Sequence, residues 1–181
     1  MSAIGKASGK IILMGEHSVV YGQPAIAMPF SAVEIIAKVT AQGEALSVDC
    51  DFYKGLVHKM PKIWESLKHA IRFSLYRIGA PTDPAIHIKI SSTIPAERGM
   101  GSSAAVAVAV ARALFAHYEK ILTDKELWEI VQSSEKIAHG NPSGIDAATT
   151  SGKSPVFFIK NQPMEPLELK LSAYLVVADT G

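Results

Sequence analysis

The amino-acid sequence predicts an α+β fold, built as a mixed β-sheet with helices mainly on one face. Segments with the period-two alternation of half-buried strands lie on both sides of a helical segment whose apolar residues form a stripe. Two more helical segments then follow each other directly, before the chain returns to short apolar strands. This order lacks the regular strand–helix alternation of doubly wound parallel sheets. The sequence therefore argues against a Rossmann-type fold.

The composition indicates one globular domain and argues against several classes of partner. Of the 181 residues, 48% are hydrophobic and 19% are charged, which is typical of a chain with a packed core. The formal net charge is only +1 and no cluster of lysine and arginine is present. We therefore expect neither nucleic acid nor a membrane surface as a partner. The longest apolar run is also too short to span a bilayer, which takes about 20 residues.

The cysteine content and the N-terminus indicate the compartment. Cys50 is the single cysteine, so an internal disulfide is excluded. The first residues lack the charged, apolar and small-residue pattern of a signal peptide. We expect a cytoplasmic protein.

The first elements expected along the chain are strands. Lys10 precedes a short apolar run at 11–14, which predicts a buried strand that turns at Gly15. The loop that follows carries Glu16 and His17, more polar chemistry than a connector between apolar strands needs. On this pattern alone, Lys10 is also explained as a solvated lysine at a strand edge. Further strands are expected at residues 25–28, 33–40 and 46–52.

A helix and a strand lead from there to the centre of the chain. Pro61 is suited to the first position of a helix, and apolar residues then recur on one stripe as far as Ile78, before Gly79 ends the helix. The next strand alternates isoleucines with polar residues over 86–91. His87 falls on its polar face, so we interpret it as a surface or structural residue, together with His58, His69 and His117.

The stretch from Pro95 to Ala116 combines a flexible loop with a buried helix. Gly99 and Gly101 allow backbone amides to approach a ligand, and the Ser102 and Ser103 hydroxyls are suited to N-capping. Every residue over 104–111 is alanine or valine, which predicts a helix buried on all sides. The free amides and the dipole of such a helix start favour an anion, and phosphate is the usual one.

Two observations limit this interpretation. An ordinary tight loop before a core helix has the same pattern. The lysine of the common P-loop is also missing from GMGSSA, so a phosphate site would need its cation and metal ligands from elsewhere in the chain.

The next helix carries an acidic residue at an unfavourable position. Thr123 and Glu126 form a capping box at its start, and Gly140 is expected to end it. Glu135 lies near the C-terminal end, where the helix dipole disfavours a carboxylate. After a turn at 141–144, Asp146 opens a short helix, for which a local capping role is the alternative to a functional one. Three short strands are expected in the tail, at residues 155–159, 167–171 and 174–178.

Three separated segments together resemble one enzyme family. These are KIILMGEHSVVYG, PAERGMGSSAA and EKIAHGNPSGID. The chain is similar to the superfamily of galactokinases, homoserine kinases, mevalonate kinases and phosphomevalonate kinases, and GEHSVVYG with HGNPSGID resembles the mevalonate kinases in particular. The match covers most of the chain. It implies the fold of the family's N-terminal domain, which is similar to domain 2 of a ribosomal protein.

The resemblance also implies roles for individual residues. The family's glycine-rich loop embraces the phosphates of ATP, which maps onto Pro95, Gly99, Met100, Gly101, Ser102, Ser103 and Ala104. Its magnesium ligands match Ser103 and Glu135, a hydroxyl and a carboxylate of the kind that Mg²⁺ prefers. The catalytic carboxylate and the lysine near it match Asp146 and Lys10. Glu16 and His17 match the segment that lines the acceptor pocket, and Ser143 either contacts the same pocket or stabilises the turn.

The reaction implied is transfer of the γ-phosphoryl group of ATP to mevalonate, which yields phosphomevalonate for isoprenoid biosynthesis. Phosphomevalonate and homoserine kinases are alternatives with the same fold, and a nucleotide-binding fragment without catalysis is an alternative of another class. Family members carry a C-terminal domain, so we expect residues 1–181 to be the N-terminal ATP-binding and catalytic domain, with the C-terminal domain absent. A homodimer is expected from the resemblance only.

Overall fold

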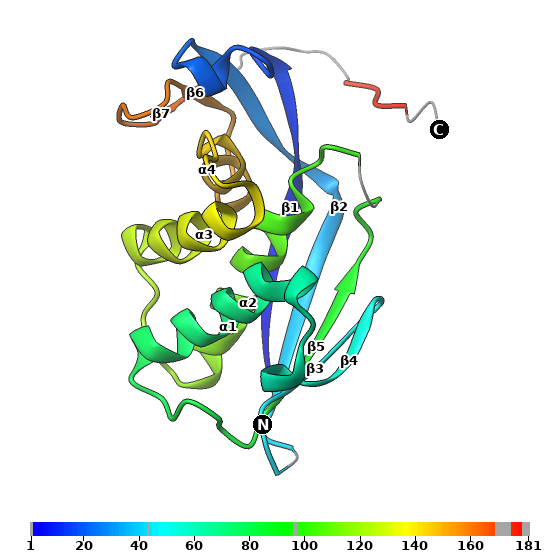
Figure 1. Cartoon of the computed structure of the whole chain (residues 1–181). Coiled ribbons are helices and arrows are strands. Elements are labelled where there is room, and N and C mark those ends of the chain that lie inside the picture. The colour runs from blue at the N-terminus through cyan, green and yellow to red at the C-terminus, as the bar shows by residue number, and fades with distance from the viewer. Residues whose placement is uncertain (1, 43, 96–97, 169–174, 179–181) are drawn as a thin grey trace.

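The computed structural model describes residues 2–42, 44–95, 98–168 and 175–178, in which strands and helices form two layers (Figure 1). The strands are β1 (Ser2–Met14), β2 (Ala25–Thr40), β3 (Ser47–Cys50), β4 (Tyr53–Leu56), β5 (His87–Ser92), β6 (Val156–Phe158) and β7 (Glu165–Pro166). The α-helices are α1 (Glu65–Ile78), α2 (Ser102–His117), α3 (Asp124–His139) and α4 (Ile145–Ser151). Short 3₁₀ turns lie at Val19–Tyr21, Val57–Lys59 and Lys62–Trp64.

The strands form one mixed sheet around β2. Its strand order is β4-β3-β5-β2-β6-β7, and β1 pairs with β2 in addition. The pairs are antiparallel except for β3 with β5, which run parallel. The predicted α+β class with a mixed sheet is confirmed.

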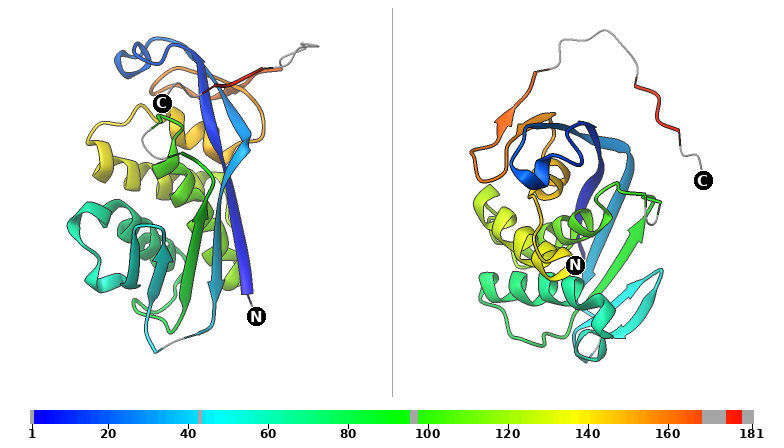
Figure 2. Two further views of the ribbon diagram at one scale, coloured as in Figure 1. Left: turned by 90° about the vertical axis from the view of Figure 1, so that its right-hand side faces the viewer. Right: turned by 45° about the horizontal axis from the view of Figure 1, so that its top comes forward.

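The helices cover one face of the sheet, as predicted (Figure 2). α2 lies closest to β1 and β2, with α1 and α3 beside it, and its residues 104–111 are buried apart from Val106, which is half-buried. Small side chains allow this close approach. A Cβ atom built on Gly5 of β1 would lie 2.1 Å from the Ala109 carbonyl oxygen of α2, so only glycine fits at this crossing.

α4 is held between two apolar clusters. Ala147 belongs to the main core beneath the sheet, whereas Ile145 and Ala148 belong to a smaller cluster with Val19, Ala25, Ala27, Val156 and Phe158. The helix is short, but its buried face contacts elements from both ends of the chain. Packing on two sides fixes the position of its first turn.

Several predicted boundaries differ from the structure. The strands expected at 25–28 and 33–40 are one long strand, β2, because its pairing with β1 continues across a bulge in β2, where Ser8 pairs with Glu34 and Gly9 pairs with Phe30. β4 was not predicted. In the tail, only β6 matches its prediction, β7 lies just before the strand expected at 167–171, and Leu175–Ala178 form no strand. Residues 169–174 and 179–181 lie outside the described residues.

The ends of two helices test the capping predictions. α3 begins with the predicted capping box, in which Thr123 accepts from the Glu126 N–H and Glu126 accepts from the Thr123 N–H, and Gly140 ends it. For α2 the prediction was wrong. Gly101 occupies the N-cap in the left-handed conformation, and Ser102 and Ser103 lie inside the first turn without capping it. Because glycine has no side chain, the free amides of this turn have no side-chain acceptor at the N-cap.

No helix in the part of the chain that the structure describes is both long and apolar enough to cross a membrane.

Candidate active site

The loop before α2 is fastened to strand β1 beside Lys10. Gly99 and Gly101 have φ values of +65° and +70°, which favour glycine. The Lys10 N–H donates to the Met100 carbonyl at 3.0 Å, and a Cβ atom on Gly101 would lie 3.0 Å from Lys10 Cγ. The loop therefore brings the free amides at the start of α2 to the strand that carries this lysine. The sequence had suggested a ligand role for both glycines; the structure adds a packing reason for Gly101.

Lys10 and Asp146 form an ion pair, although they lie near opposite ends of the chain. Lys10 Nζ is 2.6 Å from Asp146 Oδ1. The lysine is only 6% exposed, whereas 30% of the Asp146 side chain is accessible. Asp146 is in the first turn of α4, after Gly144 at φ +96°, and Gly144 rather than Asp146 occupies the N-cap. The local-cap alternative for Asp146 is therefore not what the structure shows, and Lys10 is not a solvated lysine at a strand edge.

Glu135 is a buried carboxylate, and one of its oxygens has no hydrogen-bond partner among the described residues. It is 2% exposed, and the unpartnered oxygen is Oε1. Burial raises the pKa of Glu135, and the Ser103 hydroxyl opposes the rise. The charge of Asp146 raises this pKa further, whereas His139 and Lys10 lower it. Four of the predicted site residues thus act on one another electrostatically.

His139 is the remaining neighbour of this carboxylate. Its Nε2 atom lies 3.7 Å from Glu135 Oε2, and 57% of the side chain is exposed. The contact is made one helical turn away on α3. It leaves Oε1 without a partner.

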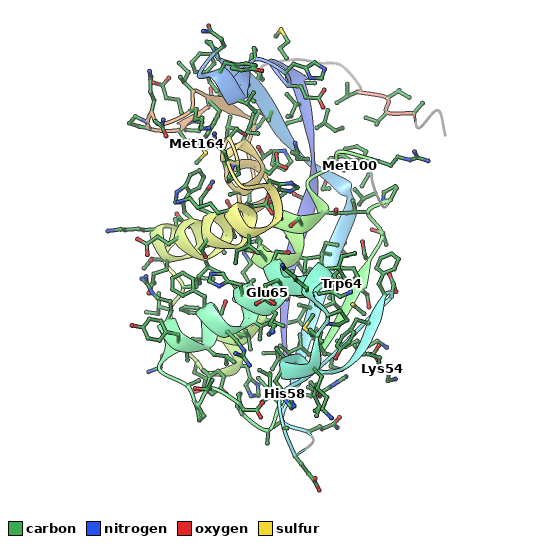
Figure 3. All side chains as sticks on the ribbon, in the orientation of Figure 1. Lys54, His58, Trp64, Glu65, Met100 and Met164 are labelled. Carbon is green, nitrogen blue, oxygen red and sulfur yellow. The ribbon has the colours of Figure 1, made fainter. Side chains whose placement is uncertain are left out.

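A cavity of about 300 Å³ lies between β1 and the loop, at the position of Met100 in Figure 3. Five of the predicted site residues line it, namely Lys10, Glu16, Pro95, Gly99 and Met100. Arg98 lines it too and was not predicted, because a single arginine between Pro95 and Gly99 forms no pattern of its own. The remaining lining residues are Ile11, Ile12, Val177 and Ala178.

Two predicted acceptor residues lie outside this cavity. His17 is exposed and lines none of the cavities described here. The Ser143 hydroxyl accepts from the Ile145 N–H at 3.3 Å, which is the turn-stabilising role. Ser143 lines a separate cavity of about 930 Å³ between α3, α4 and the loop that contains Met164 (Figure 3).

A third, apolar cavity of about 230 Å³ adjoins the start of α2. Ser102 and Ser103 line it at one side, and Phe52 and Trp64 line it at another, near the Trp64 label in Figure 3. The two rings stack with their centroids 5.8 Å apart. Cys50 also lines this cavity. No sequence pattern indicates this cavity, since Trp64 fits the apolar stripe of the predicted helix and Phe52 lies at the end of an expected strand.

The donor set fits a hard cation that keeps most of its ligands for other partners. The described residues include no group of three or more histidine, cysteine, aspartate or glutamate side chains that could hold a metal. Ser103 and Glu135 provide one hydroxyl and one carboxylate with an unpartnered oxygen. Mg²⁺ is usually bound by one or two protein oxygens together with phosphates and water.

Comparison with known families agrees with this fold. The model of the GHMP kinases N terminal domain matches residues 63–153, which contain the glycine-rich loop, α2, α3 and α4. The chain belongs to the GHMP kinases.

Several similar proteins within this family are mevalonate kinases. The mevalonate kinase of Pyrococcus horikoshii is 32% identical over 98% of this chain and 57% of the relative. The crystal structure of the Methanococcus jannaschii mevalonate kinase has a TM-score of 0.80 at 24% identity, over 94% of this chain and 57% of that one. The mevalonate kinase from methicillin-resistant Staphylococcus aureus MRSA252 is 38% identical, with a TM-score of 0.67, over 92% and 55%. The chain therefore spans somewhat more than half the length of the proteins that it matches.

Proposed function

We propose that this chain provides the ATP-binding and catalytic part of a kinase that phosphorylates the primary hydroxyl of mevalonate. The observation that carries the proposal is the ion pair between Lys10 and Asp146, held beside a glycine-rich loop at a helix N-terminus. A carboxylate that accepts a proton, next to a site for phosphate, is the arrangement needed for phosphoryl transfer to an alcohol.

In this proposal Asp146 orients the acceptor hydroxyl and takes its proton. Its side chain is accessible, whereas Lys10 is buried behind it, so the acceptor meets the carboxylate first. Lys10 Nζ, at 2.6 Å, holds the carboxylate in place and favours the alkoxide that develops. The γ-phosphoryl group passes directly to the acceptor oxygen, without a phosphoenzyme.

The phosphates of ATP lie at the loop and the first turn of α2 in this assignment. The amides there have no side-chain cap, so an anion can satisfy them. Ser103 and Glu135 would hold Mg²⁺, which neutralises phosphate charge when bound. The unpartnered Oε1 of the buried Glu135 supports this role.

The apolar cavity beside Ser102 and Ser103 is the place that we assign to the adenine base. It adjoins the phosphate site, and its stacked Phe52 and Trp64 rings offer a flat apolar wall to a heterocycle. The cavity at Lys10 and Glu16 is then left for the acceptor. The mevalonate kinases among the relatives support mevalonate as that acceptor.

The acceptor is tested with the full protein in which residues 1–181 occur. Assays with Mg-ATP and each of mevalonate, phosphomevalonate and homoserine should show the highest kcat/KM with mevalonate, by at least about 10-fold, which corresponds to about 1.4 kcal/mol. Faster turnover of phosphomevalonate or homoserine would contradict the choice of acceptor. Isothermal titration that shows Mg-ATP binding with no transfer to any acceptor would favour the nucleotide-binding module instead.

The cytoplasmic location and the homodimer stay predictions. Cell fractionation and light scattering of the purified protein test them.

A further inference from the structure

Arg112 of α2 joins the two elements that carry the ion pair. Its Nη1 donates to the Lys6 carbonyl of β1 at 2.6 Å, and its Nη2 donates to the Ser151 carbonyl of α4 at 2.7 Å. Lys10 follows Lys6 on the same strand, and Asp146 belongs to the same short helix as Ser151. β1 and α4 are therefore tied twice, once by the guanidinium and once by Lys10 with Asp146.

A salt bridge does not explain the position of Arg112. The residue is half-buried, and none of the carboxylates that the structure describes lies within salt-bridge distance of it. Burial lowers the pKa of Arg112, and only the longer-range charge of Asp124 opposes this. A desolvated cation without a carboxylate is a cost to stability, so its retention needs another reason.

The two carbonyls explain how the cation is satisfied. The Lys6 carbonyl accepts from Arg112, and among the described residues β1 pairs with β2 alone, so its other edge has no strand partner. Ser151 is the last residue of α4, whose final carbonyls have no partner within the helix and form the negative end of its dipole. The planar fork of an arginine can bond both at once, whereas a lysine offers donors from a single atom.

The surroundings make this bridge rigid. Gly5, next to Lys6, contacts the backbone of α2 one turn before Arg112. α4 is packed between two apolar clusters. Both ends of the bridge are thus fixed, and a shift of α4 relative to β1 would have to break one of two bonds shorter than 3 Å.

We infer that Arg112 is a positioning residue, which sets the distance between Lys10 and Asp146 by fixing α4 against β1. Arg112 contacts neither of these side chains and acts only through the backbone of their elements. The effect of Arg112 on catalysis rests on the proposed function. Its effect on the geometry of the ion pair, which we call the geometric statement, does not.

The geometric statement is tested by a double-mutant cycle in urea unfolding. Lys10→Met, Asp146→Asn and their combination give the coupling free energy of the ion pair, first in the otherwise unsubstituted chain and then in Arg112→Met. The coupling in the Arg112→Met background should fall to less than half. An unchanged coupling there would overturn the inference.

Arg77→Met is the matched control. Arg77 also bridges two elements, since it bonds Glu129 and Glu126 of α3 from α1, but it lies away from the ion pair. Its loss should destabilise the fold and leave the coupling between Lys10 and Asp146 unchanged. Should Arg112→Met fail to fold, Arg112→Lys carries the test, because it keeps the charge but loses the fork, and an intermediate coupling is expected.

Kinetics give a separate readout. In a protein that turns over, Arg112→Met should lower kcat by about 10-fold and leave KM for ATP within about twofold, because misplacement of reacting groups affects the chemical step. The kcat of Arg112→Lys should lie between those of the unsubstituted protein and Arg112→Met. A change in KM alone would contradict the positioning role. If the unsubstituted protein transfers no phosphate while Arg112→Met still halves the coupling, the proposed function fails and the positioning role stands.

Discussion

The two ends of α3 carry glutamates with opposite surroundings. Glu126, in the first turn, accepts from the Thr123 N–H and hydroxyl and from Arg77, and these contacts lower its pKa. Glu135, near the last turn, is buried with Oε1 unpartnered, and burial raises its pKa. The helix dipole favours a carboxylate at the first position and disfavours it at the second.

This contrast separates stability from function within one helix. The satisfied Glu126 is explained by the fold alone. The unsatisfied Glu135 costs stability, since a buried acceptor without a partner is expensive. A residue whose local surroundings do not account for it points to a ligand, here the proposed metal.

The largest effect is expected from Asp146→Ala. Turnover should fall by about 10³-fold or more because the acceptor loses its base, while the affinity for nucleotide changes little. Steady-state kinetics and isothermal titration measure the two. Asp124→Ala, at the far end of α3, is the control and should leave turnover within about twofold.

Glu135→Gln tests the contrast itself. The affinity for Mg-ATP should fall by about 10-fold or more, with partial rescue at raised Mg²⁺, because the amide is a weaker ligand for a hard cation. Without Mg²⁺ the variant should be at least as stable as the original, because a buried carboxylate with an unpartnered oxygen is removed. Titration calorimetry and thermal unfolding measure both.

Glu126→Gln should give the reverse pattern at the other end of the helix. We expect lower stability and unchanged affinity for Mg-ATP. Equal losses of affinity in the two variants would remove the distinction between the ends of α3.

Ser103→Ala should resemble Glu135→Gln but be milder. Water can replace a hydroxyl ligand, so we expect an affinity loss of only about two- to fivefold, which is about 0.4 to 1 kcal/mol. Titration of Mg-ATP at several Mg²⁺ concentrations checks it. A loss larger than that of Glu135→Gln would show that the serine has the stronger role.

The smallest effect is expected from Thr123→Ala. Loss of the cap should lower stability by about 1 kcal/mol and leave turnover unchanged. Because the pKa of Glu126 is lowered in the folded state, its contribution is present above the unfolded pKa and is lost as pH falls through the folded pKa. Urea unfolding between pH 3 and 7 should therefore show a weaker pH dependence in the variant. An unchanged pH dependence would mean that the capping box does not hold Glu126.

The sequence predicted features that depend on local rules and missed those that depend on distant contacts. The capping box at Thr123 and the buried start of α2 follow from short-range patterns and were confirmed. The prediction of a serine N-cap for α2 was wrong, because the close approach of Gly101 to Lys10 outweighs the preference for serine at the N-cap position. A strand near the C-terminal end of the described residues was expected from its apolar pattern, but Leu175–Ala178 pair with no strand.

The site shows the same division. Motif spacing and the resemblance selected Lys10, Ser103, Glu135 and Asp146, which the structure brings together, although their roles stay predictions. The aromatic cavity at Phe52 and Trp64 could not be predicted, because it forms between segments with ordinary core patterns. Arg112 was also missed, since its partners are backbone carbonyls and carry no sequence pattern.

The ion pair between Lys10 and Asp146 has a consequence for biosynthesis. β1 can pair with β2 once the first hairpin has left the ribosome, but α4 emerges only after most of the chain. At about 5 to 20 residues per second, on the order of 10 s separate the two residues. During that interval Lys10 lacks its carboxylate and remains hydrated. A nascent chain that ends before α4 therefore already contains the loop, α2 and Glu135, which we assign to ATP and the metal, but lacks Asp146. The elements assigned to the nucleotide are thus made before the carboxylate assigned to catalysis.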